Sequence, residues 1–254
     1  MPMMPLLFLA FLLLSAPQAM ALTIVTEDAP PSTIVRGETL TGSSVEVVRE
    51  IQKRTGDSSR IEVYPWARAY TMATSEPDVV LFAATRTSER EPLFTWIGPV
   101  MRVKWAFFGM AGKARPLASL EDAKKAPSIG AYKDDAREQF LRRQGFTNLD
   151  SASSPDKNLR KLQAGRVEYV VSTDTGIGAV LDQAGMKPGD VENVFTFKTV
   201  DLYIVFSRGS APATVAAWEK AFDEMSADGT LKAIQARWYP EKVSCAKEPS
   251  GRSN

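Results

Sequence analysis

The chain contains no histidine among its 254 residues. A Ser-His-Asp or Cys-His catalytic arrangement therefore cannot be built, and neither can a zinc site with imidazole ligands. General acid–base chemistry would fall to carboxylates, lysines or tyrosines. This absence removes most hydrolase mechanisms, although not every enzyme, and we expect no catalytic residue, no cofactor and no metal.

The chain also has only one cysteine and almost no net charge. The single cysteine, Cys245, stands in a polar tail, where it is either a free, inert thiol or a thiol that pairs between chains. The formal net charge is +1, which gives no basic footprint for binding nucleic acid and no reason to expect electrostatic docking on a membrane.

Long hydrophobic runs are also missing, apart from one near the N-terminus. Residues 6–14 are apolar, but this run is shorter than the about 20 residues that a membrane-spanning helix needs. A more polar stretch follows and ends in Ala19-Met20-Ala21, the small-x-small pattern that a signal peptidase accepts. We expect residues 1–21 to be a signal peptide, cleaved before Leu22, and the mature protein to be periplasmic. The alternative is a buried or anchoring N-terminal helix, because the segment has no Lys or Arg.

The rest of the chain alternates short apolar runs with helical patterns, which is typical of an α/β fold. Val79–Ala84 is apolar throughout, as expected for a strand buried in a parallel sheet. The pattern predicts one helix from Ser43, with Glu46 completing a capping box and Gly56 ending it. It predicts another from Trp66 to about Ser75.

The chain reads as two lobes, because a second α/β set follows Gly98-Pro99 and the last section returns to the first lobe. Crossings near Pro99–Lys104 and Phe197–Val200 would form a hinge, and a cleft between α/β lobes is a natural site for a small molecule. The expected division is a signal peptide at 1–21, the first lobe at 22–103, the second lobe at 104–197, the return to the first lobe at 198–240 and a polar tail at 241–254.

The order of several sequence blocks resembles the family 3 extracellular solute-binding proteins, the polar-amino-acid receptors of bacterial transporters. The blocks span Leu22 to about Tyr239, nearly the whole mature chain. They include Gly42-Ser43-Ser44-Val45-Glu46, Thr85-Arg86-Thr87-Ser88-Glu89-Arg90, Phe94-x-Trp96-x-Gly98-Pro99 and Leu162-Gln163-Ala164-Gly165-Arg166-Val167-Glu168. The resemblance implies a type II periplasmic-binding-protein fold with a two-crossing hinge and an interlobe ligand cleft.

The resemblance also implies three ligand contacts in the first lobe. Arg90 matches the family's arginine that clamps the ligand carboxylate, a task for which the planar fork of a guanidinium is suited. Thr85 stands where a hydroxyl and a backbone amide help to hold that carboxylate, and Trp66 where an aromatic lid covers the ligand. The alternatives are a surface arginine at a helix start and a tryptophan that only fills the core.

Other charged residues lie near these positions. Arg68 and Arg86 would make the first lobe attractive to an anionic group, unless they are solvated or paired with acids. Glu27 and Asp28 end the first strand, where such folds place ligand contacts, so they could receive a ligand amine. Their alternative role is to form the turn.

The second lobe departs from the family pattern. Family receptors have a Gly followed by Ser or Thr at a helix start aimed at the ligand carboxylate, whereas this chain has Tyr132-Lys133-Asp134-Asp135-Ala136, with Asp134 as the expected helix cap. Carboxylates there stabilise the helix dipole but repel an anionic ligand group. Asp174 matches the family's ammonium-binding Asp only with a one-residue offset. These departures favour a cationic or differently shaped polar ligand over a standard α-amino acid.

We therefore expect a monomeric carrier that captures a small polar solute, an amino acid or a related amine or organic acid, for an ABC transporter permease. Closure of the lobes would follow from ligand contacts to both of them. Two alternatives stay open: a cyclohexadienyl-dehydratase-like enzyme on the same fold, and a sensor component that presents its bound ligand to a receptor.

Overall fold

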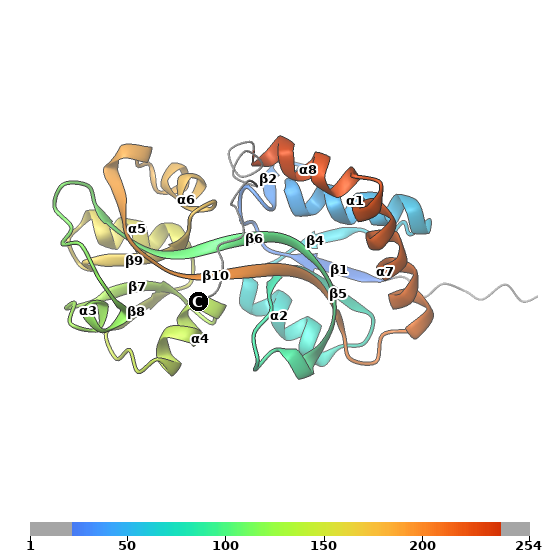
Figure 1. Ribbon diagram of the computed structural model, residues 1–254, viewed down its shortest axis with the longest axis horizontal. Helices are drawn as coiled ribbons and strands as arrows, with labels where there is room; N and C mark the ends of the chain where they lie inside the picture. The colour runs from blue at the N-terminus through green and yellow to red at the C-terminus, as the bar shows by residue number, and fades with distance from the viewer. Residues whose placement is uncertain (1–21, 240–254) are drawn as a thin grey trace, which may run out of the picture.

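The computed structural model describes residues 22–239, which form two lobes joined by two long strands (Figure 1). The expected signal peptide and Cys245 lie outside the described residues. Within the described range, no helix combines the length and the apolar character that crossing a bilayer requires.

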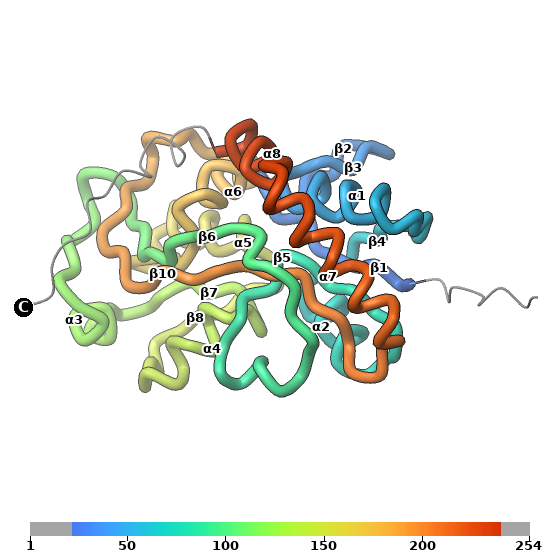
Figure 2. Tube along the Cα trace, turned by 45° about the vertical axis from the view of Figure 1, so that its right-hand side comes forward, coloured from blue at the N-terminus to red at the C-terminus, as the bar shows by residue number. Residues whose placement is uncertain are grey.

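One eight-stranded sheet runs through both lobes in the order β4-β1-β5-β10-β6-β9-β7-β8. Its strands are β1 (Thr23–Thr26), β4 (Ile61–Val63), β5 (Val79–Thr85), β6 (Phe94–Met110), β7 (Ile129–Tyr132), β8 (Leu149–Ala152), β9 (Tyr169–Thr173) and β10 (Val191–Ser207). The outer strands of each lobe pair in parallel. The central strands β6 and β10 have 17 residues each, pair antiparallel and run side by side through both lobes (Figure 2).

Helices cover both faces of the sheet. In the first lobe, α1, α7 and α8 lie over one face and α2 over the other; in the second lobe, α5 and α6 lie opposite α3 and α4. The helices are α1 (Ser43–Thr55), α2 (Trp66–Ser75), α3 (Leu120–Lys124), α4 (Ala136–Arg143), α5 (Pro155–Gln163), α6 (Ile177–Ala184), α7 (Pro212–Ala227) and α8 (Thr230–Trp238). A small hairpin, β2 (Ile34–Arg36) and β3 (Thr39–Thr41), and two 3-10 turns (Glu91–Leu93, Pro188–Asp190) complete the fold.

Strand β5 shows why an uninterrupted apolar run suits this position. Val80 and Phe82 point into the cluster beneath α1 and α7, while Val79 and Leu81 point into the cluster beneath α2. Successive side chains of a strand face opposite sides, so a strand covered on both faces needs apolar residues at every position. The prediction of a buried strand from Val79 is confirmed.

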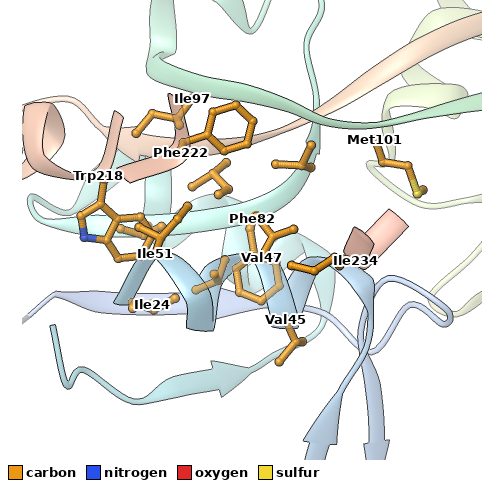
Figure 3. Close-up of a cluster of buried hydrophobic side chains, with 14 of the residues drawn as sticks. Ile24, Val45, Val47, Ile51, Phe82, Ile97, Met101, Trp218, Phe222 and Ile234 are labelled. Carbon is orange, nitrogen blue, oxygen red and sulfur yellow. The ribbon is translucent and has the colours of Figure 1, made fainter. Parts of the chain in front are cut away.

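The main core lies between the sheet of the first lobe and helices α1, α7 and α8 (Figure 3). Helix α1 buries Val45, Val48 and Ile51, the apolar face expected from their helical spacing. From α7, Trp218 is 1% exposed and meets the ring of Phe206 edge-on at 5.3 Å. Helices α7 and α8, the last in the described range, therefore pack into the same core as α1.

Two details of the sequence analysis are wrong. Gly42, not Ser43, is the N-cap of α1, and the Ser43 hydroxyl bonds to that of Tyr239 at 2.8 Å, so no capping box forms. The N-cap of α4 is Asp135 rather than Asp134, because Asp134 still belongs to the preceding turn, with a φ of 61°.

An aromatic cluster supports the strands where they enter the second lobe. The rings of Phe107 and Phe197 lie 4.8 Å apart, and Phe140 of α4 stacks on Phe197 at 5.9 Å. Trp105 meets Phe140 at 5.8 Å. These contacts attach α4 to the crossing strands.

We predict that Trp218→Ala lowers the free energy of unfolding by about 3–5 kcal/mol, because it removes a large side chain from a closed core. Lys220→Ala, two residues along the same helix, has a side chain that is 79% exposed and should cost roughly 0.5 kcal/mol or less. Urea denaturation of both variants measures the difference. Similar losses in the two variants would contradict the assignment of α7 to the core.

Candidate ligand-binding cleft

A cavity of about 110 Å³ lies between the two lobes. Its polar lining side chains are Glu27, Asp28, Ser32, Thr85, Tyr132, Asp135, Arg137, Ser172, Thr173, Thr175 and Gln183. Its apolar lining includes Ala83, Met101, Val103, Trp105, Val180 and Leu202. The hinge strands β6 and β10 thus supply much of the apolar wall, and both lobes supply the polar groups.

The direction of the parallel strands explains this position. Glu27 follows β1 and Thr85 ends β5 in the first lobe, while Tyr132 ends β7 and Thr173 ends β9 in the second lobe. Ligands of open α/β sheets bind outside the carboxyl ends of the strands. Here, the carboxyl ends from both lobes meet at one cavity.

Glu27 is a carboxyl group that reaches across the cleft. Its Oε2 accepts a hydrogen bond of 3.0 Å from the hydroxyl of Tyr132 in the other lobe. Burial, together with repulsion from Asp135, raises the pKa of Glu27 from 4.5 to about 7. A cation placed against this group would restore its charged form, so the cavity holds an acid whose charge a ligand can stabilise.

Asp28 is more exposed than Glu27. Its Oδ1 accepts a hydrogen bond of 3.2 Å from the backbone N–H of Val35, which ties the β1 turn to the β2–β3 hairpin. Burial also raises its pKa, although the hydrogen bond acts in the opposite direction. The turn-forming role and the ligand-facing role of Asp28 are therefore compatible.

Asp135 and Arg137 form an ion pair in the wall of the second lobe. Asp135 Oδ1 accepts hydrogen bonds from the backbone N–H of Arg137 at 2.9 Å and from its Nε at 2.5 Å. The side chain of Asp135 is 14% exposed and that of Arg137 is 17% exposed. Burial opposes ionisation of Asp135, but attraction to Arg137 outweighs it and lowers the pKa of the acid. The lobe thereby presents a guanidinium in a fixed orientation.

Arg90 does not line this cavity. It is 1% exposed, and its guanidinium carbon lies 5.2 Å from the ring centre of Trp66 and 4.8 Å from that of Tyr70. Its Nη2 donates to Gln139 Oε1 at 3.2 Å, across the lobes, while Nε and Nη1 are buried without a hydrogen-bond partner in the described range. Burial lowers the pKa of this guanidinium. Arg90 is therefore no surface arginine.

The other residues expected at the site are divided between the cavity and its surroundings. Thr85 lines the cavity. Trp66, by contrast, is 3% exposed and packs in the core between α2 and the sheet. Its Nε1 donates a hydrogen bond of 3.3 Å to the backbone carbonyl of Asp134. Asp174 stands between two lining threonines, but its Oδ1 accepts from the backbone N–H of Lys104 at 3.0 Å.

The two further arginines of the first lobe lie away from the cavity lining. Arg68 stacks over the Tyr64 ring at 4.1 Å. Arg86 makes two hydrogen bonds with the carboxylate of Glu91, at 2.5 and 2.6 Å. Arg86 is thus paired with an acid and Arg68 is exposed to solvent, the two alternatives that the sequence left open for these residues.

The lobes touch beside the cavity through several polar contacts. In addition to the bonds of Tyr132, Trp66 and Arg90 described above, Arg143 of α4 pairs with Glu89 at 2.9 Å. Each contact joins the first lobe to the β7–α4 region of the second lobe. The structure is therefore a closed arrangement on this side of the cleft.

A wider and more open hollow of about 560 Å³ adjoins the cavity. The two share Glu27, Asp28, Tyr132, Pro155 and Gln183 in their walls. Asp156 at the start of α5 adds another carboxylate to the outer hollow. The lining of the outer hollow is therefore acidic as well.

Sequence reasoning missed Arg137, and toward a ligand it assigned Asp135 only a repulsive role. The signal was the Asp-x-Arg spacing at a helix start, because an N-cap carboxylate lies close to the side chain two residues later. It also missed the lining residues Met101 and Trp105, whose inward direction depends on how β6 pairs with β10. Among residues 22–239, no group of three or more acidic or thiol side chains is placed to hold a metal ion.

Comparisons with known proteins give a consistent picture. The sequence profile of bacterial extracellular solute-binding proteins, family 3, matches residues 22–241. The L-cystine-binding protein TcyA of Bacillus subtilis (strain 168) is 25% identical over 206 residues, which are 81% of this chain and 75% of that protein.

Two solved structures show the same fold. A histidine kinase sensor domain with similarity to periplasmic binding proteins has a TM-score of 0.79 and 19% identity, covering 87% of this chain and 96% of its own. An ancestral arginine-binding protein bound to arginine has a TM-score of 0.75 and 22% identity, covering 86% and 98%. The expected type II periplasmic-binding-protein fold is confirmed.

The raised pKa of Glu27 predicts a pH-dependent stability. The folded state holds this proton more tightly than the unfolded state, so the free energy of unfolding should fall as pH rises from about 4.5 to 7. In Glu27→Gln, the decrease in the free energy of unfolding over this pH range should be smaller by about 1–3 kcal/mol. Urea denaturation at a series of pH values measures it, with Glu38→Gln on the exposed β2–β3 hairpin as the control. Parallel curves for the wild type and Glu27→Gln would refute the prediction.

Proposed function

The chain belongs to the bacterial extracellular solute-binding proteins of family 3, and we propose that it captures a small solute with a cationic group between its lobes. The observation that carries this proposal is the charge of the interlobe cavity. Glu27, Asp28 and Asp135 line it against one arginine, Arg137. Carboxylates that are held away from water are stabilised by a cation, so closure around a cationic ligand is favoured over closure around an anion.

The contacts proposed for the ligand come from both lobes. Glu27 and Asp28 would receive an ammonium or guanidinium group, and the hydroxyls of Thr85 and Thr173 would hydrogen-bond to its polar parts. Trp105 and Met101 would cover an aliphatic segment. A ligand that touches both lobes stabilises the closed state in proportion to its preference for that state, which is the physical basis of capture.

The same proposal covers location and delivery. Family membership supports an extracellular or periplasmic protein, and the signal peptide over residues 1–21 would direct its export. The relatives named for L-cystine and arginine support an amino acid or a related amine as the solute. The protein would act as a monomer and pass the solute to a membrane transporter permease. A sensor domain shares the fold, so the fold alone does not decide between transport and signalling.

We predict that cationic solutes stabilise the protein. In a thermal-shift panel of arginine, lysine, agmatine, cadaverine, cystine, glutamate and succinate, the cations should raise the unfolding midpoint. Saturation at 100 times the dissociation constant adds about 2.7 kcal/mol. Glu27→Gln should weaken binding of the best cation roughly tenfold or more, because a charge-assisted bond is lost. Glu38→Gln, the same substitution outside the cleft, should leave binding unchanged.

Two results would count against the proposal. A shift with glutamate or succinate alone would mean that the cavity selects anions. The absence of a shift with any solute, at several pH values, would argue against a carrier.

The dehydratase-like alternative is testable on the same preparation. An acid with a pKa of about 7 beside an arginine is also what protonation of a leaving hydroxyl requires. Incubation with prephenate or arogenate should leave both compounds unchanged. Formation of phenylpyruvate or phenylalanine, lost in Glu27→Gln, would make the chain an enzyme.

A further inference from the structure

Two arginines near the cleft differ in their access to a ligand. Arg90, on the first lobe, has its guanidinium enclosed by Trp66 and Tyr70 and lies outside the cavity lining. Arg137, on the second lobe, lies in the cavity wall and keeps 17% of its side chain exposed. The residue that sequence resemblance assigns to the ligand carboxylate is thus the less accessible of the two.

Arg137 also has free donors. Its Nε and its backbone N–H both donate to Asp135 Oδ1, and this fixes the plane and direction of the guanidinium. Its two terminal amino groups make no hydrogen bond to any residue of the described range 22–239. A guanidinium that is held by one edge leaves its other edge, with paired N–H groups, free for a carboxylate.

The cavity places this cation close to an acid of the first lobe. Glu27 and Arg137 line the same small space, and each shifts the pKa of the other toward the charged form. A molecule that carries one positive and one negative group could therefore pair with both walls at once. An amine that lacks a carboxylate would satisfy the first lobe alone.

We infer that Arg137 is the carboxylate-binding residue of this protein and that its ligand is a zwitterion, with its cationic group toward Glu27 and its carboxylate toward the second lobe. This inference rests on the proposed function, which already includes amino acids among the solutes, and it assigns the carboxylate of the ligand to the second lobe. Asp135 is the positioning residue that orients the guanidinium. Arg90 serves the contact between the lobes through Gln139 rather than the ligand.

The test compares each amino acid with its decarboxylated amine: arginine with agmatine, and lysine with cadaverine. Isothermal titration calorimetry gives the affinity ratio for the wild type, Arg137→Gln and Arg90→Gln. Because Arg137→Gln leaves Asp135 buried without its partner, the double variant Asp135→Asn/Arg137→Gln provides a second readout if the single variant does not fold. Arg142→Gln is the matched control, since it lies on the same helix with a side chain that is 56% exposed and outside the cavity lining.

The wild type should bind the amino acid roughly 10- to 100-fold more tightly than the amine, the range expected for hydrogen bonds to a charged group. Arg137→Gln or the double variant should bring the ratio to within about threefold. Arg90→Gln and Arg142→Gln should keep the wild-type ratio.

Four results would overturn the inference. They are equal binding of amine and amino acid by the wild type, a ratio that survives in Arg137→Gln or the double variant, a ratio that is lost in Arg90→Gln, and a ratio that is lost in Arg142→Gln. All four leave the proposed function standing, because the wild type still binds a cationic solute. Failure of the wild type to bind any of the four probes overturns the inference, and if no solute of the thermal-shift panel binds either, the proposed function falls as well.

Discussion

The pairing of β6 with β10 is the constraint on which the rest of the molecule depends. Because the two strands are hydrogen-bonded along both lobes, an opening of the lobes would have to bend this ribbon. The pairing changes register between Asn193 and Phe195, between Thr196 and Lys198, and between Leu202 and Ile204, and a strand bends locally at such a bulge. The last two shifts lie on either side of the cavity lining at Trp105 and Met101. The hinge and the floor of the site are therefore the same piece of structure.

The charged residues of the cleft determine which kind of ligand would stabilise the closed lobes. Closure brings Glu27 of the first lobe against Tyr132 of the second lobe, and it removes water from Glu27 and from the ion pair of Asp135 and Arg137. Water leaves a carboxylate at a high cost unless a cation or hydrogen-bond donors replace it. Burial therefore raises the pKa of Glu27, and a cation bound against this group would stabilise its charged form. On the proposed function, the choice of ligand and the closure of the lobes depend on the same electrostatic interaction.

The sequence predicted the fold well, because the spacing of buried residues and the residues that begin and end helices are local features of the chain. The bounds of α2 and the buried strand that begins at Val79 could be read directly from the chain. The site could be predicted only in part. Glu27 and Asp28 follow from the end of a strand and Thr85 from the family resemblance, but the direction of Arg137 depends on a cap one residue later than expected, at Asp135. The enclosure of Arg90 depends on aromatic rings that α2 brings from elsewhere in the sequence, which no local pattern encodes.

The two arginines and Asp135 together explain how a closed state can exist with so much buried charge. Asp135 is held ionised chiefly by Arg137, and Arg90 of the opposite lobe adds a further attraction. A buried guanidinium is costly when it is alone, and Arg90 has two nitrogens without hydrogen-bond partners in the described range. The approach of the second lobe gives it Gln139 and the field of Asp135, so closure stabilises Arg90 as well as the ligand. An arginine that matches the family's clamp thus contributes to closure through the facing lobe, while Arg137 on that lobe lies in the cavity wall, where we infer that it meets the solute.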